Sequence, residues 1–269
     1  MIRLIALFAT LCLLQTPAPL TAQESLEEIV RVDVLDGGRM ADGKVQAALK
    51  LTLAPGWKTY WRAPGDAGIP PEFDWSGSSN ISAAALVWPT PEVFHLDGLR
   101  SIGYKHQLVL PVILTPKEPG QPIRLSGRID FGVCSDVCIP ASLSFDSALE
   151  PGAKRNPAIA AAMAARPLSA NEAGAGKARC ALKPTANGME VTAEIDLPPT
   201  GGTEVAVIET GNPKLWASEP VVTRSGNRLR ATSELVHVEG KPYALDRSAL
   251  RLTVLGSSRA VDIRGCESG

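Results

Sequence analysis

The sequence predicts an all-β protein of two β-sandwich domains, joined by a linker that contains one short helix. Its 269 residues exceed the roughly 100 that a single sandwich needs. Short strand-like runs, bounded by Gly, Pro, Asn and Asp, fill both halves of the chain. Residues 151–177 differ, because they are rich in alanine. We therefore expect a signal segment at 1–22, sandwiches at 23–150 and 178–269, and a linker between them.

The chain begins with a segment typical of a secretory signal peptide. A short basic start precedes an apolar run, 4–14, that is too short to span a bilayer. Cleavage is expected after Ala22, with Ala18 as the alternative site. An uncleaved membrane anchor is the other interpretation. Export would place the mature protein in an oxidising compartment and would remove Cys12.

The first sandwich is predicted from period-2 alternation, which is clearest over 46–53. Prolines between 64 and 122 would break helices and mark loops and strand edges. Examples of the expected strands are 29–35, 45–53, 57–61, 86–88, 107–114, 123–133 and 141–145.

The linker opens with Pro-Gly-Ala-Lys-Arg-Asn-Pro and contains an alanine-rich helix, expected at 158–166. The second, smaller sandwich is predicted because strand-like runs return after 178, separated by glycine-containing turns. Its expected strands are 190–197, 204–209, 221–223, 228–235 and 250–254.

Charge and motifs exclude several classes of function. The 27 basic and 28 acidic residues give a net charge of −1 without a basic stripe, which argues against a nucleic-acid partner. The sequence has no Gly-x-Ser-x-Gly, no phosphate-binding glycine loop and no His-Glu-x-x-His. Hydrolase and nucleotide-binding functions therefore have no support, and no cofactor is expected.

Four cysteines remain after the signal segment: Cys134, Cys138, Cys180 and Cys266. An extended strand would hold the first two roughly 13 Å apart, so a disulfide between them needs a turn at 135–137, which Ser and Asp favour. In a loop-entropy estimate, a Cys180–Cys266 bridge closes about 87 residues and stabilises by roughly 4.6 kcal/mol, against about 2 kcal/mol for the short loop. We interpret the long bridge as a structural staple, with free or intermolecular thiols as the alternative.

The short cysteine pair has three interpretations. It is a hairpin staple, a redox pair, or part of a Cu(I) site completed by His95 or His106, since two thiolates suit Cu(I). A tight turn can strain a disulfide, and strained, accessible disulfides exchange readily with an incoming thiolate. The spacing therefore favours a redox role, and no metal site is expected.

Four motifs in order resemble the N-terminal domain family of the thiol:disulfide interchange protein DsbD. The resemblance covers about 30–148, and the run 60–71 is most similar to the ScsB-like branch. The motifs are Gly-Trp-Lys-Thr-Tyr-Trp-Arg (56–62), Trp-Pro-Thr-Pro-Glu-Val-Phe (88–94), Gly-Tyr-Lys followed by Leu-Val-Leu-Pro-Val (103–112), and Val-Cys-Ser-Asp-Val-Cys-Ile-Pro-Ala (133–141).

The resemblance implies an immunoglobulin-like sandwich and a periplasmic thiol:disulfide oxidoreductase that relays electrons through Cys134 and Cys138. It implies a cap loop carrying Phe94 and an active-site neighbour in Tyr60; for each, an ordinary core or surface aromatic is the alternative. Asp136 either raises a thiol pKa or satisfies the turn amides.

Two departures from the family pattern matter. The family's cysteines are separated by five residues, whereas three intervene here. The chain also lacks a transmembrane conduit and a thioredoxin-like domain. We therefore expect a separate membrane-embedded reductase as electron donor and periplasmic thioredoxin-like or disulfide-bearing proteins as acceptors. The competing functions are a non-enzymatic binding module with structural disulfides, and copper handling linked to copper tolerance.

Overall fold

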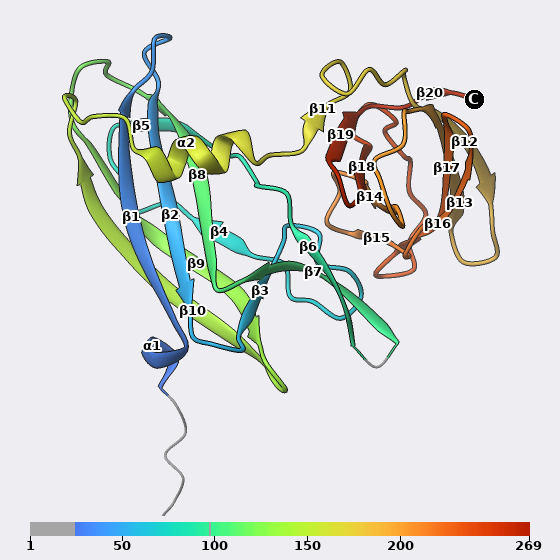
Figure 1. Ribbon diagram of the computed structural model, residues 1–269, viewed down its shortest axis with the longest axis horizontal. Helices are drawn as coiled ribbons and strands as arrows, with labels where there is room; N and C mark the ends of the chain where they lie inside the picture. Colours follow the sequence, from blue (N-terminus) through green and yellow to red (C-terminus); the bar gives the residue numbers. More distant parts are fainter. Residues whose placement is uncertain (1–24, 97) are drawn as a thin grey trace, which may run out of the picture.

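The computed structural model describes residues 25–96 and 98–269, and these form two sandwich-like domains that are almost entirely β (Figure 1). The expected fold class is therefore confirmed. The expected signal peptide, with Cys12, lies outside the described residues. Within the described ranges, no helix is long and apolar enough to cross a membrane.

The first sandwich packs a four-stranded sheet against a six-stranded one. The four-stranded sheet has the order β1 (Val30–Arg39), β2 (Val45–Leu53), β8 (Gln107–Pro116), β5 (Ile81–Leu86). The other has the order β10 (Cys138–Leu149), β9 (Ile123–Cys134), β3 (Lys58–Tyr60), β7 (Leu99–Lys105), β6 (Glu92–Leu96), and β4 (Glu72–Asp74) also pairs with β9. Alternation explains the core, because Leu49 and Leu51 of β2 point inward and are buried with Leu110 and Phe131. A short helix, α1 (Leu26–Ile29), precedes β1.

The second sandwich repeats this design with a separate core. One sheet has the order β11 (Leu168–Ser169), β19 (Ala260–Arg264), β18 (Arg251–Leu255), β14 (Val205–Glu209). The other has the order β15 (Leu215–Ala217), β17 (Arg228–His237), β13 (Met189–Asp196), β12 (Arg179–Pro184), β20 (Glu267–Ser268), and β16 (Val221–Ser225) also pairs with β17.

The linker helix α2 (Pro157–Ala164) lies along the first sandwich (Figure 1). Asn156 caps it by accepting a hydrogen bond from the Ala158 amide, and Pro157 suits the first helical turn. The helix buries Ile159 completely. It ends before the expected residue 166 because Pro167 disfavours helical geometry at the residue that precedes it.

Several strand assignments differ from the sequence-based expectation. The ranges named from the sequence do not include the strands β4, β6, β7, β11, β12, β15, β19 and β20. The strand expected at 86–88 is β5, which ends at Leu86. Its Ser-Ala-Ala-Ala stretch has low intrinsic strand propensity, and pairing with β8 holds it extended. The expected cap segment around Phe94 is strand β6, paired with β7.

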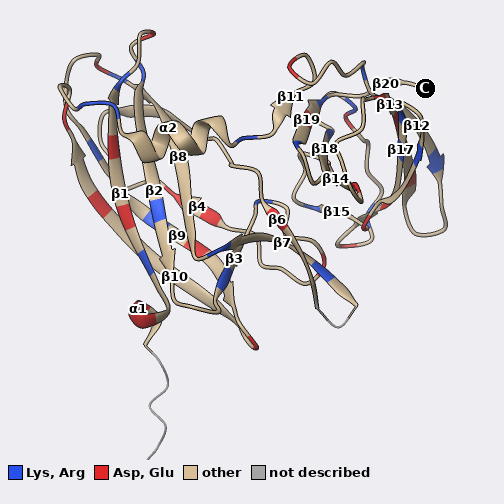
Figure 2. Ribbon diagram, viewed as in Figure 1, with Lys and Arg blue, Asp and Glu red and all other residues tan. Residues whose placement is uncertain are grey.

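Acidic and basic residues are interspersed over both sandwiches (Figure 2). This distribution agrees with the near-zero net charge and shows no basic stripe on the described residues.

Candidate functional site

A disulfide joins Cys134 and Cys138 at the end of the β9–β10 hairpin, where the two cysteines are the last paired residues. Their Cα atoms are 4.0 Å apart. The chain reverses over 135–137, and the Ser135 amide donates a hydrogen bond to the Val137 carbonyl at 3.2 Å. Cys134 is 3% exposed, whereas Cys138 is exposed. Of the two cysteines, Cys138 is therefore the residue that is more accessible to solvent.

Sheet register places the neighbours of the disulfide. Directly paired residues in antiparallel strands share a face, and Cys134 is opposite Lys58, which is in turn opposite Lys105. Tyr60 is two residues from Lys58 and projects from the same face. The opposite face of this sheet carries buried core residues such as Val133. The site is therefore built on the outer face of the six-stranded sheet.

Tyr60 contacts the disulfide directly. Its Oη lies 3.1 Å from Cys138 Sγ and 3.3 Å from the carbonyl oxygen of Ala67. In the oxidised protein the sulfur carries no proton, so the hydroxyl is the donor to either acceptor. Tyr60 is 2% exposed, and burial raises the pKa of its phenol. The hydroxyl therefore keeps its proton and can donate it to a thiolate.

Two glycines make room for the Tyr60 ring. A Cβ atom on Gly132 would lie 2.8 Å from Tyr60 Cε2, and one on Gly68 would lie 2.9 Å from Tyr60 Cδ1. Gly132 is on β9, and Gly68 belongs to the segment 62–71 that crosses the outer face of the sheet. Any larger side chain at either position would push the ring away from Cys138.

Lys58, Lys105 and Phe94 form a cluster beside Cys134. The ammonium groups of Lys58 and Lys105 lie 5.1 Å and 4.7 Å from the centroid of the Phe94 ring, within cation–π range. Lys58 Nζ is also 3.4 Å from Ser101 Oγ. Burial, and then the charge of Lys105, lower the pKa of the Lys58 ammonium. Phe94 is therefore on the face that carries the cysteines, but its described cation–π contacts are with the lysines.

Comparison with known proteins matches the first sandwich to one family. Residues 27–149 match the family model "Thiol:disulfide interchange protein DsbD, N-terminal". The N-terminal periplasmic domain of ScsB from Proteus mirabilis has the same fold, with a TM-score of 0.68 and 21% identity, covering 92% of this chain and 97% of that one. Residues 27–149 form a DsbD N-terminal-like domain.

A second solved structure, the reduced DsbD N-terminal domain from Neisseria meningitidis, has a TM-score of 0.25 and 18% identity, covering 44% of this chain and 85% of that one. No curated protein matches the sequence.

Asp136 is exposed and lies in the turn between the two cysteines of the DsbD N-terminal-like domain. Among the described contacts, the turn is closed by the Ser135 amide and the Val137 carbonyl, not by the Asp136 carboxylate. Its role in tuning a thiol stays a prediction.

The second disulfide joins Cys180 of β12 to Cys266 in the second sandwich. Cys180 is 2% exposed, and 86 positions separate the two cysteines. This bridge belongs to the core of the second sandwich, and its role as a structural staple stays a prediction.

The histidines considered for a Cu(I) site lie outside the cysteine hairpin. His95 is on β6 and His106 follows β7. Within the described residues, no group of three or more His, Cys, Asp or Glu side chains could hold a metal ion.

Lys58, Gly132 and the Ala67 carbonyl were missed as site elements from the sequence. Period-2 alternation in Trp57-Lys58-Thr59-Tyr60 was the available signal for Lys58, because it puts Lys58 and Tyr60 on one face. No comparable signal marks Ala67, since its contribution is a backbone carbonyl.

Proposed function

We propose that the protein is a periplasmic thiol:disulfide oxidoreductase that relays electron pairs through Cys134 and Cys138. The observation that carries this proposal is the asymmetry of the pair: Cys138 is exposed and contacts a tyrosine hydroxyl, whereas Cys134, paired with it across the hairpin, is buried. A purely structural hairpin staple would not need an accessible sulfur. The family match and the periplasmic setting of the ScsB domain of similar fold support the assignment.

Reduction begins when a thiolate of a donor dithiol attacks Cys138 Sγ. The Cys134–Cys138 bond breaks, Cys134 leaves as a thiolate, and a mixed disulfide joins the donor to Cys138. The donor's second thiolate then attacks its own sulfur in the mixed disulfide and releases Cys138 as a thiolate. Two electrons have entered the pair, and the donor is left as a disulfide. The donor in this proposal is a separate membrane-embedded reductase.

Delivery reverses these steps with a different partner. The Cys138 thiolate attacks an acceptor disulfide, and the acceptor's leaving thiolate takes a proton. Cys134, as thiolate, then attacks Cys138 Sγ, which restores the intramolecular disulfide and releases a reduced acceptor. The acceptors in this proposal are periplasmic thioredoxin-like or disulfide-bearing proteins.

The surrounding groups suit these steps. The Tyr60 hydroxyl can donate to a Cys138 thiolate. Lys58, which is paired with Cys134 in the sheet, puts a positive charge on the same face, and this charge favours a Cys134 thiolate. Both effects raise the fraction of thiolate, which is the nucleophile in exchange.

The protein contains its own control for a test of this proposal. We expect the Cys134–Cys138 disulfide to have a reduction potential above about −300 mV, so that a glutathione redox buffer reduces it. The Cys180–Cys266 disulfide should stay oxidised in the same buffer. Differential alkylation followed by mass spectrometry reports the two bridges separately. If both disulfides have reduction potentials below about −300 mV, the Cys134–Cys138 bridge is a structural staple and the proposed electron relay is wrong.

Partner capture gives the second arm of the test. A Cys134→Ala variant should accumulate a mixed disulfide on Cys138, because no resolving thiolate remains. A Cys138→Ala variant should capture far less, since Cys134 is buried. Equal capture by both variants would contradict the assignment of Cys138 as the exchanging sulfur.

A further inference from the structure

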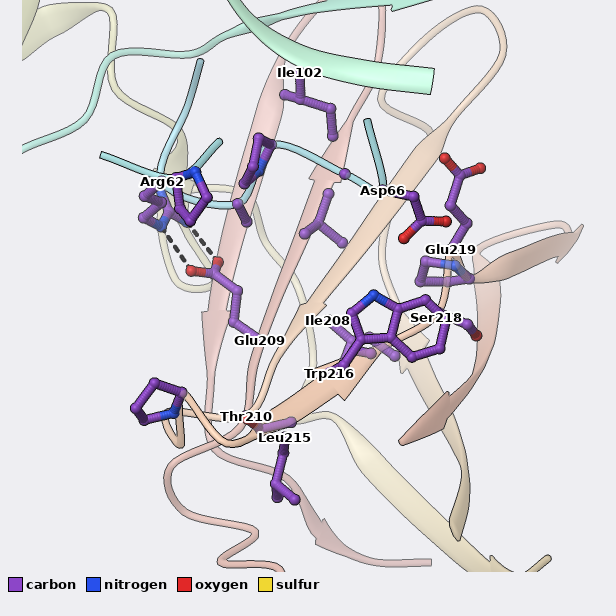
Figure 3. Close-up of a pocket in the computed structure, with 18 of the residues that line it drawn as sticks. Arg62, Asp66, Ile102, Ile208, Glu209, Thr210, Leu215, Trp216, Ser218 and Glu219 are labelled. Carbon is purple, nitrogen blue, oxygen red and sulfur yellow. Dashed lines mark hydrogen bonds and ion pairs between the residues drawn. The ribbon is translucent and has the colours of Figure 1, made fainter. Parts of the chain in front are cut away.

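The second sandwich is anchored to the segment that holds Tyr60. Arg62 follows Tyr60 by two residues, and its Nε and Nη2 each donate to the Glu209 carboxylate of β14 at 2.9 Å. Nη2 also donates to Thr253 Oγ1 at 3.1 Å. Figure 3 shows the paired hydrogen bonds between Arg62 and Glu209 at one side of the pocket between the sandwiches.

This junction is buried and stacked. The Arg62 side chain is 11% exposed, and its guanidinium carbon lies 3.8 Å from the centroid of the Trp61 ring, which is fully buried. Burial lowers the pKa of Arg62, and the charge of Glu209 opposes that shift. A charge buried to this extent needs its partner, and Glu209 supplies it from the second sandwich.

Apolar contacts and a second ion pair reinforce the junction. Val207, Leu255 and Ala260 of the second sandwich pack into the same apolar cluster as Trp61. Arg100 of β7 pairs with Glu219 at 3.2 Å. The residues of both ion pairs line a cleft of about 550 Å³ between the sandwiches. Residues 63–66 form part of its wall, and Figure 3 shows Asp66 among the lining side chains.

The segment 62–71 connects this junction to the disulfide. The Ile102 amide donates to the Pro64 carbonyl at 2.9 Å, which ties the segment to β7. The Ala67 carbonyl accepts from the Tyr60 hydroxyl, and Gly68 packs on the Tyr60 ring. One side of this segment therefore lines the interdomain cleft, and the other side holds the ring that contacts Cys138.

We propose that the second sandwich is a positioning element for the cysteine pair: through the Arg62–Glu209 junction it holds segment 62–71 against Tyr60 and so keeps the phenol on Cys138. This inference rests on the proposed redox function for its biological purpose. The property that it predicts is the reactivity of the Cys138 thiol, which can be measured without any partner protein. Glu209 and Arg62 are positioning residues in this scheme, because neither contacts the sulfur.

The test measures the alkylation rate of Cys138 by iodoacetamide in the full-length protein, with the pair reduced, between pH 5 and 10. Tyr60→Phe should raise the Cys138 pKa by about one unit, which slows alkylation at pH 7 about tenfold. Glu209→Gln should slow it about threefold, because the loosened segment holds the ring less well. Glu219→Gln should act in the same direction and provides a second variant if the first folds poorly.

A matched control separates positioning from general loss of stability. Glu204 pairs with Arg224 inside the second sandwich, and its side chain is 7% exposed against 22% for Glu209. Glu204→Gln therefore removes a more buried ion pair from that domain without changing the Arg62–Glu209 junction. Its Cys138 pH profile should be that of the wild type. In a Tyr60→Phe background, Glu209→Gln should have no further effect on the profile, because the group it positions is gone.

Three outcomes would overturn the proposal: an unchanged or faster rate in both Glu209→Gln and Glu219→Gln, equal slowing by Glu204→Gln, or full additivity with Tyr60→Phe. These results are independent of the proposed function. Failure of the redox relay would instead appear as a resistant disulfide or as absent partner capture in the wild-type chain.

Discussion

The two sandwiches each contain one disulfide, but they place it in opposite ways. In the first, the bridge spans four positions at the tip of a hairpin and leaves Cys138 exposed. In the second, it spans 86 positions and starts from a buried cysteine. A bridge across a long loop removes much more entropy from the unfolded chain, whereas a bridge at a tip is accessible to other thiols. The same covalent bond therefore suits stability in one domain and exchange in the other.

The largest expected effect that tests this contrast is on stability. Replacing Cys180 and Cys266 by Ala should lower the free energy of unfolding by about 4–5 kcal/mol, and replacing Cys134 and Cys138 by Ala should lower it by about 2 kcal/mol. Urea unfolding followed by circular dichroism measures both. A larger loss from the hairpin pair would reverse the roles assigned to the two bridges.

A smaller effect is expected where the first sandwich accommodates Tyr60. Gly132→Ala would put a Cβ atom 2.8 Å from the Tyr60 ring and 2.9 Å from Ile69 Cβ. We expect a loss of about 1–3 kcal/mol in unfolding free energy, together with slower alkylation of Cys138.

The control for this change is Gly152→Ala, because a Cβ atom there meets no other atom within 4 Å. It should change stability by less than about 0.5 kcal/mol and leave alkylation unaltered. Equal behaviour of the two variants would show that Tyr60 does not depend on the space at Gly132.

The smallest expected difference between the two domains is in their stability at low pH. Burial raises the pKa of Asp262, but hydrogen bonds and ion pairing with Arg251 outweigh it, so the pKa is lowered from its ordinary value of 3.8. A lowered carboxyl pKa stabilises the fold above the unfolded value, and that contribution disappears as pH falls below 3.8 towards the folded pKa. In the first sandwich, the carboxyl with a comparable pair, Asp146 with Arg124, is exposed and contributes little.

Hydrogen exchange between about pH 5 and pH 2 should therefore show β14 and β18 losing protection before β2 and β8. An Asp262→Asn variant should lack this extra loss, and Asp146→Asn should behave as the wild type. Parallel loss of protection in both domains would remove the predicted difference.

Much of the fold could be predicted from the sequence, because alternation and turn residues are local signals. The strands around Leu49 and Leu51 follow from period-2 burial, and the turn at 135–137 follows from the need to bring two cysteines together. Strand β5 was misplaced because its alanine-rich sequence has no β-branched residue after Ile81, and only pairing with β8 extends it.

The candidate site was predicted in part. Cys134, Cys138 and Tyr60 are brought together, and the Tyr60 hydroxyl contacts Cys138 from 78 positions away. Phe94 lies on the same face, but its partners, Lys58 and Lys105, could be found only once the register of β3 and β7 was known.

The sequence by itself determined most of the long extended segments, which face each side chain takes within its own strand, and where two cysteines could close a turn. These properties depend on neighbours a few positions apart. Only the tertiary structure decided that the Tyr60 hydroxyl meets Cys138, that Gly68 and Gly132 enclose its ring, and that Arg62 reaches Glu209 across 147 positions. Such contacts depend on how sheets and domains pack. The periodicity of one strand does not show which residue of a distant segment a side chain will meet.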